Sequence, residues 1–164
     1  MRRGFTVWVT GPDARAVGAV VAELRTRLAG RQVPVETIDE DTPGVRGVAA
    51  ESLAVAVVPA ASLLARHGIA TIVALPGSRA ARDGARAQLG RELIEVHVSG
   101  AGAGYEPPER PEVEISAAES ASPDAVDRVM RTLEVLRLLE RDQQAYSADE
   151  EREVIRRLKA FGYL

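Results

Sequence analysis

The sequence contains no cysteine, few aromatic residues and no long apolar run, and each absence narrows the classes of protein to consider. Without cysteine the chain has no disulfide framework, no thiolate metal site and no cysteine nucleophile. No apolar run approaches the roughly 18 residues that span a membrane, and the first apolar stretch is too short and interrupted for a signal peptide. We therefore expect a cytoplasmic protein that makes no contact with a membrane.

An excess of positive charge is also missing. The chain has 21 Lys and Arg residues against 24 Asp and Glu residues, which gives a formal net charge of -3 over 164 residues. Such a chain lacks the basic field that attracts nucleic acids and anionic membranes. We therefore expect no nucleic-acid partner, and the length is that of one globular domain with a sizeable core.

Short apolar runs alternate with helical patterns along most of the chain. Strands are predicted at residues 5–10, 33–38, 69–75 and 93–98, and apolar residues recur at helical spacing between them. Trp8, in the first of these strands, is expected to pack in the core. This alternation is typical of a parallel sheet covered by helices, so the sequence predicts an α/β fold.

A segment rich in glycine and proline, residues 99–115, follows the fourth strand and contains a short predicted strand at 113–115. An amphipathic helix is then predicted from Ser122 and Pro123, because proline favours the first turn of a helix. We expect this helix to pack on the sheet.

A last amphipathic helix is predicted in the tail. It opens with a capping box made by Ser147 and Glu150, and it ends at Gly162. We expect one domain over residues 1–142 and a helical extension over residues 143–164. The apolar stripe of the extension needs a covering surface: its own domain, including the area near residues 99–104, or a second copy or other protein partner.

Five stretches, taken together and in order, resemble the adenylylsulfate kinase family. They are "GFTVWVTG", "SLLARHGIATIVAL", "RAARDGAR", "ELIEVHV" and, most specifically, "YEPPERPEV" at residues 105–113. The resemblance covers roughly residues 4–139. It implies a P-loop kinase fold, that is, a three-layer α/β sandwich with a parallel sheet of about five strands, and ATP-dependent phosphorylation of the 3'-hydroxyl of adenylylsulfate.

The phosphate-binding loop departs from the family pattern. A working loop reads Gly-x-x-x-x-Gly-Lys-Ser/Thr, in which backbone N–H groups and the lysine bind phosphate and the hydroxyl binds magnesium. In that frame this chain has Gly11, then Ala16, Val17 and Gly18. Neither Val17 nor Gly18 supplies the missing groups. The phosphate-binding remnants are then Gly11 and Gly18, with Arg15 as the one nearby cation.

Other family positions are partly kept. Asp39 and Asp41 match the family's pair of aspartates and are the candidate catalytic remnants, although an acidic loop exposed to solvent explains them as well. The family's substrate-binding asparagine and arginine fall on Leu53 and Ala56. The basic lid is reduced to "SGAGAG", which has no charge to offer a phosphate.

The arginine run of the family is retained. Arg79 and Arg82 are the candidate anion-binding residues, and Asp83 and Arg86 complete the motif. The sequence leaves open an alternative in which the three arginines form the exposed face of a helix, with Arg82 and Arg86 on either side of Asp83.

These departures favour a degenerate, catalytically inactive relative that acts as a binding or scaffolding module, linked to sulfur or nucleotide metabolism. The alternative is a kinase or phosphotransferase with a non-standard phosphate loop that uses Arg15, Asp39, Asp41 and Arg79. ATP and magnesium are cofactors only under that alternative. We expect no protein-bound metal site, because His67 and His97 are far apart in the sequence.

Overall fold

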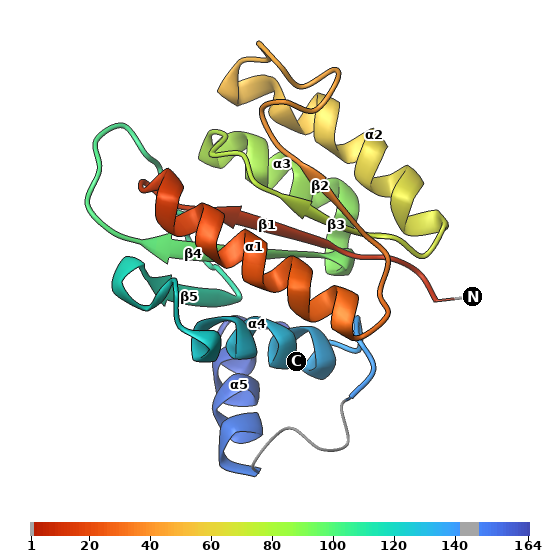
Figure 1. The fold of residues 1–164 in the computed structure, drawn as a ribbon, viewed down its shortest axis with the longest axis vertical. Coiled ribbons are helices and arrows are strands. Elements are labelled where there is room, and N and C mark those ends of the chain that lie inside the picture. Colours follow the sequence, from red (N-terminus) through yellow and green to blue (C-terminus); the bar gives the residue numbers. More distant parts are fainter. Residues whose placement is uncertain (1, 142–147) are drawn as a thin grey trace.

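The computed structural model describes residues 2–141 and 148–164 of the chain (Figure 1). Its centre is a five-stranded parallel sheet with the strand order β2-β3-β1-β4-β5. The strands are β1 (Thr6–Thr10), β2 (Val35–Ile38), β3 (Ala70–Val73), β4 (Leu93–Ser99) and β5 (Val113–Ser116). The predicted α/β fold with about five parallel strands is confirmed.

Helices cover both faces of the sheet. The α-helices are α1 (Ala14–Gly30), α2 (Leu53–Arg66), α3 (Arg79–Leu89), α4 (Pro123–Val135) and α5 (Ala148–Ala160), with short 3-10 turns at Ala50–Ser52, Gly90–Glu92 and Ala117–Glu119. Helices α1 and α4 lie on one face, and α2 and α3 lie on the other (Figure 1). The molecule is therefore the three-layer sandwich that the sequence predicts.

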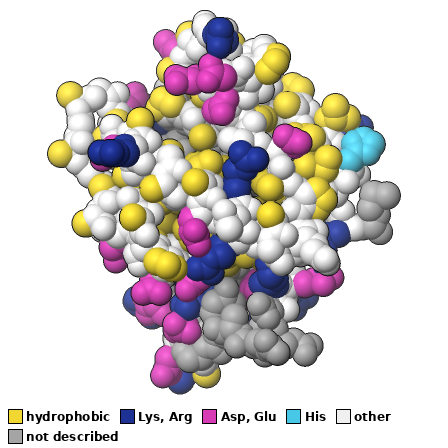
Figure 2. All heavy atoms as spheres, viewed as in Figure 1, with side chains coloured by type: hydrophobic (Ala, Val, Ile, Leu, Met, Phe, Trp, Pro, Cys, Tyr) yellow, Lys and Arg dark blue, Asp and Glu magenta, His cyan; other side chains and the backbone are white. Residues whose placement is uncertain are grey.

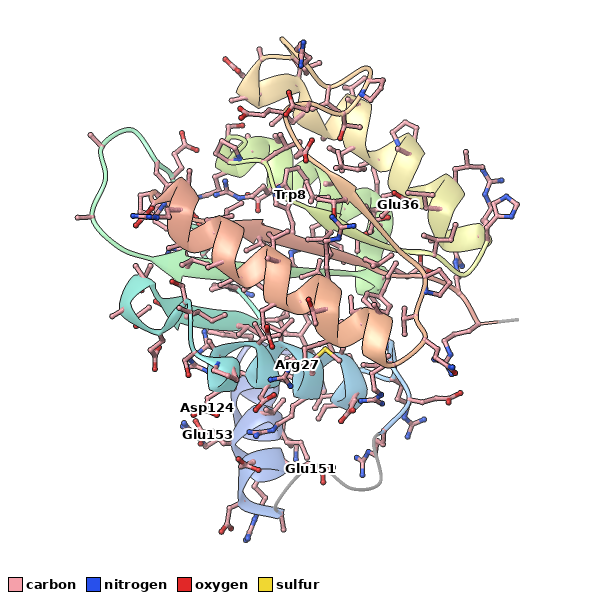
Figure 3. All side chains as sticks on the ribbon, in the orientation of Figure 1. Trp8, Arg27, Glu36, Asp124, Glu151 and Glu153 are labelled. Atoms are coloured by element: carbon pink, nitrogen blue, oxygen red, sulfur yellow. The ribbon has the colours of Figure 1, made fainter. Side chains whose placement is uncertain are left out.

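The alternation of side chains along β1 divides the core into two halves. Val7 and Val9 belong to the cluster under α1 and α4, whereas Trp8 belongs to the cluster under α2 and α3. Trp8 is fully buried, and its indole Nε1 donates a hydrogen bond of 2.7 Å to the carbonyl oxygen of Leu75 (Figure 3). The prediction that Trp8 packs in the core is confirmed.

Ion pairs tie the helices of one face together. Arg27 of α1 donates to the carboxylate of Asp127 on α4 at 2.6 Å, and Arg27 is labelled in Figure 3. On the face drawn in Figure 2, acidic and basic side chains are interspersed rather than gathered by sign. No helix in the described ranges is both long and apolar enough to cross a membrane.

The C-terminal helix packs on the domain itself. Leu158 of α5 is fully buried, and Arg131 of α4 donates to Glu150 at 2.7 Å. Helix α5 lies against α4 rather than over the segment 99–104 (Figure 1), so the surface of its own domain that it covers is not the area of the missing lid. Ser147 and the predicted boundary at residue 142 lie outside the described residues.

Candidate functional site

The residues of the phosphate loop lie where a parallel sheet binds its ligands. In open α/β sheets, ligands bind beyond the carboxyl ends of the strands. The turn from Gly11 to Asp13 follows the carboxyl end of β1, and the segment 99–104 begins with the last residue of the neighbouring strand β4. The candidate site is therefore the region where this turn, the segment 99–104 and Tyr105 meet.

The turn after β1 is too short to form a phosphate-binding loop. Helix α1 begins at Ala14, so residues 14–16, which belong to the phosphate loop in the family pattern, are helical here and cannot form a loop around a phosphate. Asp13 caps the helix, and its Oδ1 accepts hydrogen bonds from the backbone N–H groups of Arg15 at 2.9 Å and Ala16 at 3.3 Å. A carboxylate of the chain itself therefore occupies N–H groups that a phosphate would need.

The predicted phosphate-binding residues have different surroundings. Arg15 is exposed at the start of α1, while Val17 is half-buried and packs against the core. Gly18 is exposed, and a Cβ atom there would meet no atom within 4 Å. Gly11 is the opposite case, because a Cβ atom would lie 2.3 Å from the carbonyl oxygen of Val98. The packing of β1 against β4 thus accounts for Gly11 without a phosphate.

The remnant of the lid is packed against this turn. A Cβ atom added to Gly102 would lie 2.4 Å from the Cβ atom of Pro12. Only a glycine allows the segment 99–104 to approach Pro12 so closely. The segment therefore lies directly against the phosphate-loop turn.

Tyr105 anchors the end of this segment. Its hydroxyl is hydrogen bonded to Thr10 Oγ1 at 2.8 Å, and its ring stacks on His97 with 5.8 Å between the ring centroids. The guanidinium of Arg82 lies 5.6 Å from the centre of the same ring. Burial raises the pKa of Tyr105, so its hydroxyl stays protonated at neutral pH. Sequence reasoning did not identify Tyr105 as part of this site.

His97 gives this cluster a pH dependence. Burial lowers the pKa of His97 below its usual 6.5, although Glu114 at 3.7 Å opposes the shift. Because the folded state takes up its proton at a lower pH than the unfolded state, stability is present above pH 6.5 and falls as the pH drops through the folded pKa.

We therefore expect the wild-type protein to lose more stability than His97→Gln between pH 7 and the pKa of folded His97. Urea unfolding at a series of pH values measures this difference. Parallel loss of stability in both proteins over that range would show that His97 does not contribute.

The arginines of α3 make hydrogen bonds to other segments of the same chain. Arg82 is fully buried, and its guanidinium donates to the carbonyl oxygens of Pro76 at 2.6 Å, of Gly77 at 3.0 Å, and of Glu106. The backbone N–H of Arg79 donates a hydrogen bond of 2.8 Å to the carboxylate of Glu106. These contacts hold the segment that follows the lid, and the anion-binding role predicted for Arg79 and Arg82 stays a prediction.

The alternative of an exposed helix face is wrong for Arg82 and Arg86. Arg86 does not pair with Asp83, because it donates two hydrogen bonds to Glu112, at 2.6 and 2.9 Å, and one to Glu95 at 2.8 Å. The side chain of Arg86 is 24% exposed, and those of Glu95 and Glu112 are 4% and 1% exposed. The arginine run therefore faces a buried acidic pair rather than solvent.

This buried cluster was missed in the sequence, because Glu95 lies within an apolar strand and Glu112 within a proline-rich segment. Burial raises the pKa of Glu95, against the attraction of Arg86. Burial acts to lower the pKa of Arg86, but the bonds to Glu112 and Glu95 outweigh it and raise that pKa above its usual value. The cluster links α3, β4 and the "YEPPERPEV" segment through charged hydrogen bonds.

The acidic loop after β2 is held by its own contacts. Asp39 Oδ1 accepts from the N–H of Asp41 at 3.0 Å and from the hydroxyl of Thr42 at 3.2 Å, while Arg46 donates to Asp41 at 2.8 Å. Asp41 is 79% exposed. Among the described residues, no group of three His, Asp or Glu side chains could hold a metal ion.

The matched substrate positions carry no polar side chain. Leu53 is buried in the core under α2, and the half-buried Ala56 packs beside it. Neither side chain can bind a sulfate or a phosphate group.

Comparison with known proteins points to one family. No family profile matches the chain. The adenylyl-sulfate kinase of Synechococcus sp. (strain JA-2-3B'a(2-13)) is 29% identical over 170 residues, which cover 80% of this chain and 95% of that protein. The probable adenylyl-sulfate kinase of Pyrococcus abyssi is 28% identical over 165 residues, which cover 78% and 94%.

Solved structures show the same fold. The hexameric APS kinase from Thiobacillus denitrificans superposes with a TM-score of 0.71 at 24% identity and covers 86% of this chain, which spans only 31% of that longer chain. An APS kinase of Mycobacterium tuberculosis superposes with a TM-score of 0.58 at 24% identity, over 79% of this chain and 99% of that one.

Proposed function

We propose, from the premise that the chain is a homologue of the adenylyl-sulfate kinases, that it is a catalytically inactive binding or scaffolding module linked to sulfur or nucleotide metabolism. The observation that carries the proposal is the Asp13 carboxylate on the N–H groups of Arg15 and Ala16. A nucleotide phosphate would have to displace that carboxylate or bind beside it. Two unit charges 4 Å apart repel by about 1 kcal/mol even in bulk water.

The missing donors add to this repulsion. Val17 and Gly18 stand where the family has a lysine and a hydroxyl, and removal of one preorganised donor costs about 2.7 to 4 kcal/mol of transition-state stabilisation. Losing two such groups lowers a rate by a factor of about 10⁴ or more. The short segment 99–104 also brings no charge to the site, so nothing in it replaces the lost groups.

The direct test is a coupled assay with ATP, adenylyl sulfate and magnesium. We expect no magnesium-dependent turnover above background, with the Synechococcus relative as the positive control. Turnover at ordinary kinase rates, about 1 to 100 per second, would overturn the proposal.

A second candidate is a phosphotransferase that grips phosphate through Arg15, Asp39, Asp41 and Arg79. It is favoured by one observation: Arg15 is exposed beside the turn and has no ion pair in the described ranges. Calorimetric titration with ATP separates the two candidates. Micromolar, magnesium-dependent binding that weakens in Arg15→Ala, but not in the control Arg25→Ala at the exposed position 25 of the same helix, would favour the phosphotransferase.

A further inference from the structure

Helix α5 and the residues that follow it line a cleft at the opposite end of the sheet from the phosphate loop. The cleft has a volume of about 750 Å³, and its apolar walls include Leu93, Val135, Ile155 and Tyr163. Leu93 is the first residue of β4, whereas the phosphate-loop turn follows the last residue of β1. Clefts of roughly 300 to 1,000 Å³ with mostly apolar walls are typical of small-molecule sites.

The charges that line this cleft are not balanced. The two glutamate side chains that line it are already paired: Glu112 accepts from Arg86 at 2.6 Å, and Glu134 accepts from Arg31 at 3.0 Å. Arg91 and Arg137 also line the cleft, are exposed, and have no ion pair within the part of the chain that the structure describes. Two guanidinium groups are therefore left to bind an anion from outside.

The tyrosine at the cleft adds no negative charge. Burial raises the pKa of Tyr163 to about 12, so its phenol is neutral at physiological pH. Its hydroxyl donates to the carbonyl oxygen of Arg110 at 3.4 Å. Tyr163 therefore offers an aromatic surface without opposing an anion.

Arg137 occupies a backbone position that usually belongs to glycine. It has φ +60°, and it follows the last turn of α4 in a Schellman motif: its N–H donates to the Glu134 carbonyl at 3.0 Å, and that of Leu138 donates to Leu133 at 2.9 Å. The equivalent residue after α2 is Gly68. An arginine held in this conformation is costlier than glycine, and such positions gather at functional sites.

We infer that this cleft binds a small organic anion, with a carboxylate or phosphate head on Arg91 and Arg137 and an apolar or aromatic body against the half-buried Val135, Ile155 and Tyr163. Guanidinium groups suit both kinds of head because they donate paired N–H groups to two oxygens. The walls from α5 lie in the predicted helical extension, outside the stretch that resembles the kinase family. The site is therefore an addition to the kinase-like domain, and it does not depend on whether the phosphate loop is active.

The test is a titration of the whole chain with small-molecule probes, in which ¹H–¹⁵N correlation spectra are recorded at each probe concentration. The probes are benzoate, phenyl phosphate and the neutral benzyl alcohol. We expect one or both anions to shift resonances around Leu93, Arg137 and Tyr163, and the tighter of the two identifies the head group. The inference would be overturned if both anions had dissociation constants above about 1 mM, or if benzyl alcohol bound as tightly as the anions.

Two variants assign the binding to the cleft. Arg91→Gln and Arg137→Gly should each weaken anion binding roughly tenfold or more, and Arg137→Gly should unfold at an unchanged or higher temperature. The matched control is Gln32→Gly, which changes the same Schellman position after α1, at φ +56°, and does not line the cleft. Unchanged anion binding in both arginine variants, or an equal loss in Gln32→Gly, would contradict the site.

Discussion

Replacement of Glu112 by alanine is expected to destabilise the protein by about 3 to 5 kcal/mol, because it breaks a buried ion pair and leaves its partners without an acceptor. Glu112 accepts two hydrogen bonds from Arg86 and a third, at 2.7 Å, from the backbone N–H of Glu95. For a domain of this size, a loss of that magnitude lowers the melting temperature by about 10 °C. Thermal and urea unfolding measure both quantities.

Two further variants separate the charge of Glu112 from its hydrogen bonds and from a general effect of charge removal. Glu112→Gln keeps an acceptor for the Glu95 N–H, so its free energy of unfolding should lie between those of the wild type and Glu112→Ala. Asp41→Ala removes a carboxylate that is 79% exposed and paired with Arg46, and it should cost less than about 1 kcal/mol. An equal loss in Asp41→Ala and Glu112→Ala would refute the role of burial.

The second large effect is expected at Gly11. A methyl group at this position meets the carbonyl oxygen of Val98 at 2.3 Å and forces β1 and β4 apart where Thr10 pairs with His97. We expect Gly11→Ala to lower the free energy of unfolding by about 1 to 3 kcal/mol or more.

Gly18 is the matched control within the same phosphate-loop frame. It lies inside α1, and a methyl group there meets no atom within 4 Å. Gly18→Ala should therefore raise stability by about 0.5 to 1 kcal/mol, because alanine favours the helix. Urea unfolding of both variants gives the sign of each change. A Gly11→Ala protein as stable as wild type would show that β1 and β4 can separate there without cost.

The pair of variants also bears on the origin of the loop. If Gly11 is required by packing alone, its retention says nothing about phosphate binding, whereas the loss of the lysine and the hydroxyl does. The difference in packing between Gly11 and Gly18 is visible only in the structure, because the sequence does not show which atoms lie beside each glycine.

The succession of strands and helices along the chain could be predicted from the sequence, because it depends on local patterns. Short, mostly apolar runs such as residues 93–98 are typical of strands that a parallel sheet buries on both faces, and the observed strand β4 contains that run. The loss of the lysine and the magnesium hydroxyl at Val17 and Gly18 is likewise a matter of residue identity. The sequence alone establishes both.

The partners of the polar side chains could not be predicted in this way. Arg82 and Arg86 have the spacing of an exposed helix face, yet they are held by Glu106, Glu95 and Glu112, some of them more than twenty residues away. Pairing over such a distance depends on which surfaces the fold brings together, and no local pattern records it.

The same distinction applies to the two candidate sites. The sequence by itself determined the α/β fold and the missing phosphate-binding groups, because both follow from local periodicity and residue type. Only the tertiary structure decided that Gly102 and Tyr105 lie against the turn after β1, and that α5 forms a cleft with Arg91 and Arg137. Those facts depend on contacts between segments far apart in the chain, which form only when the core is packed.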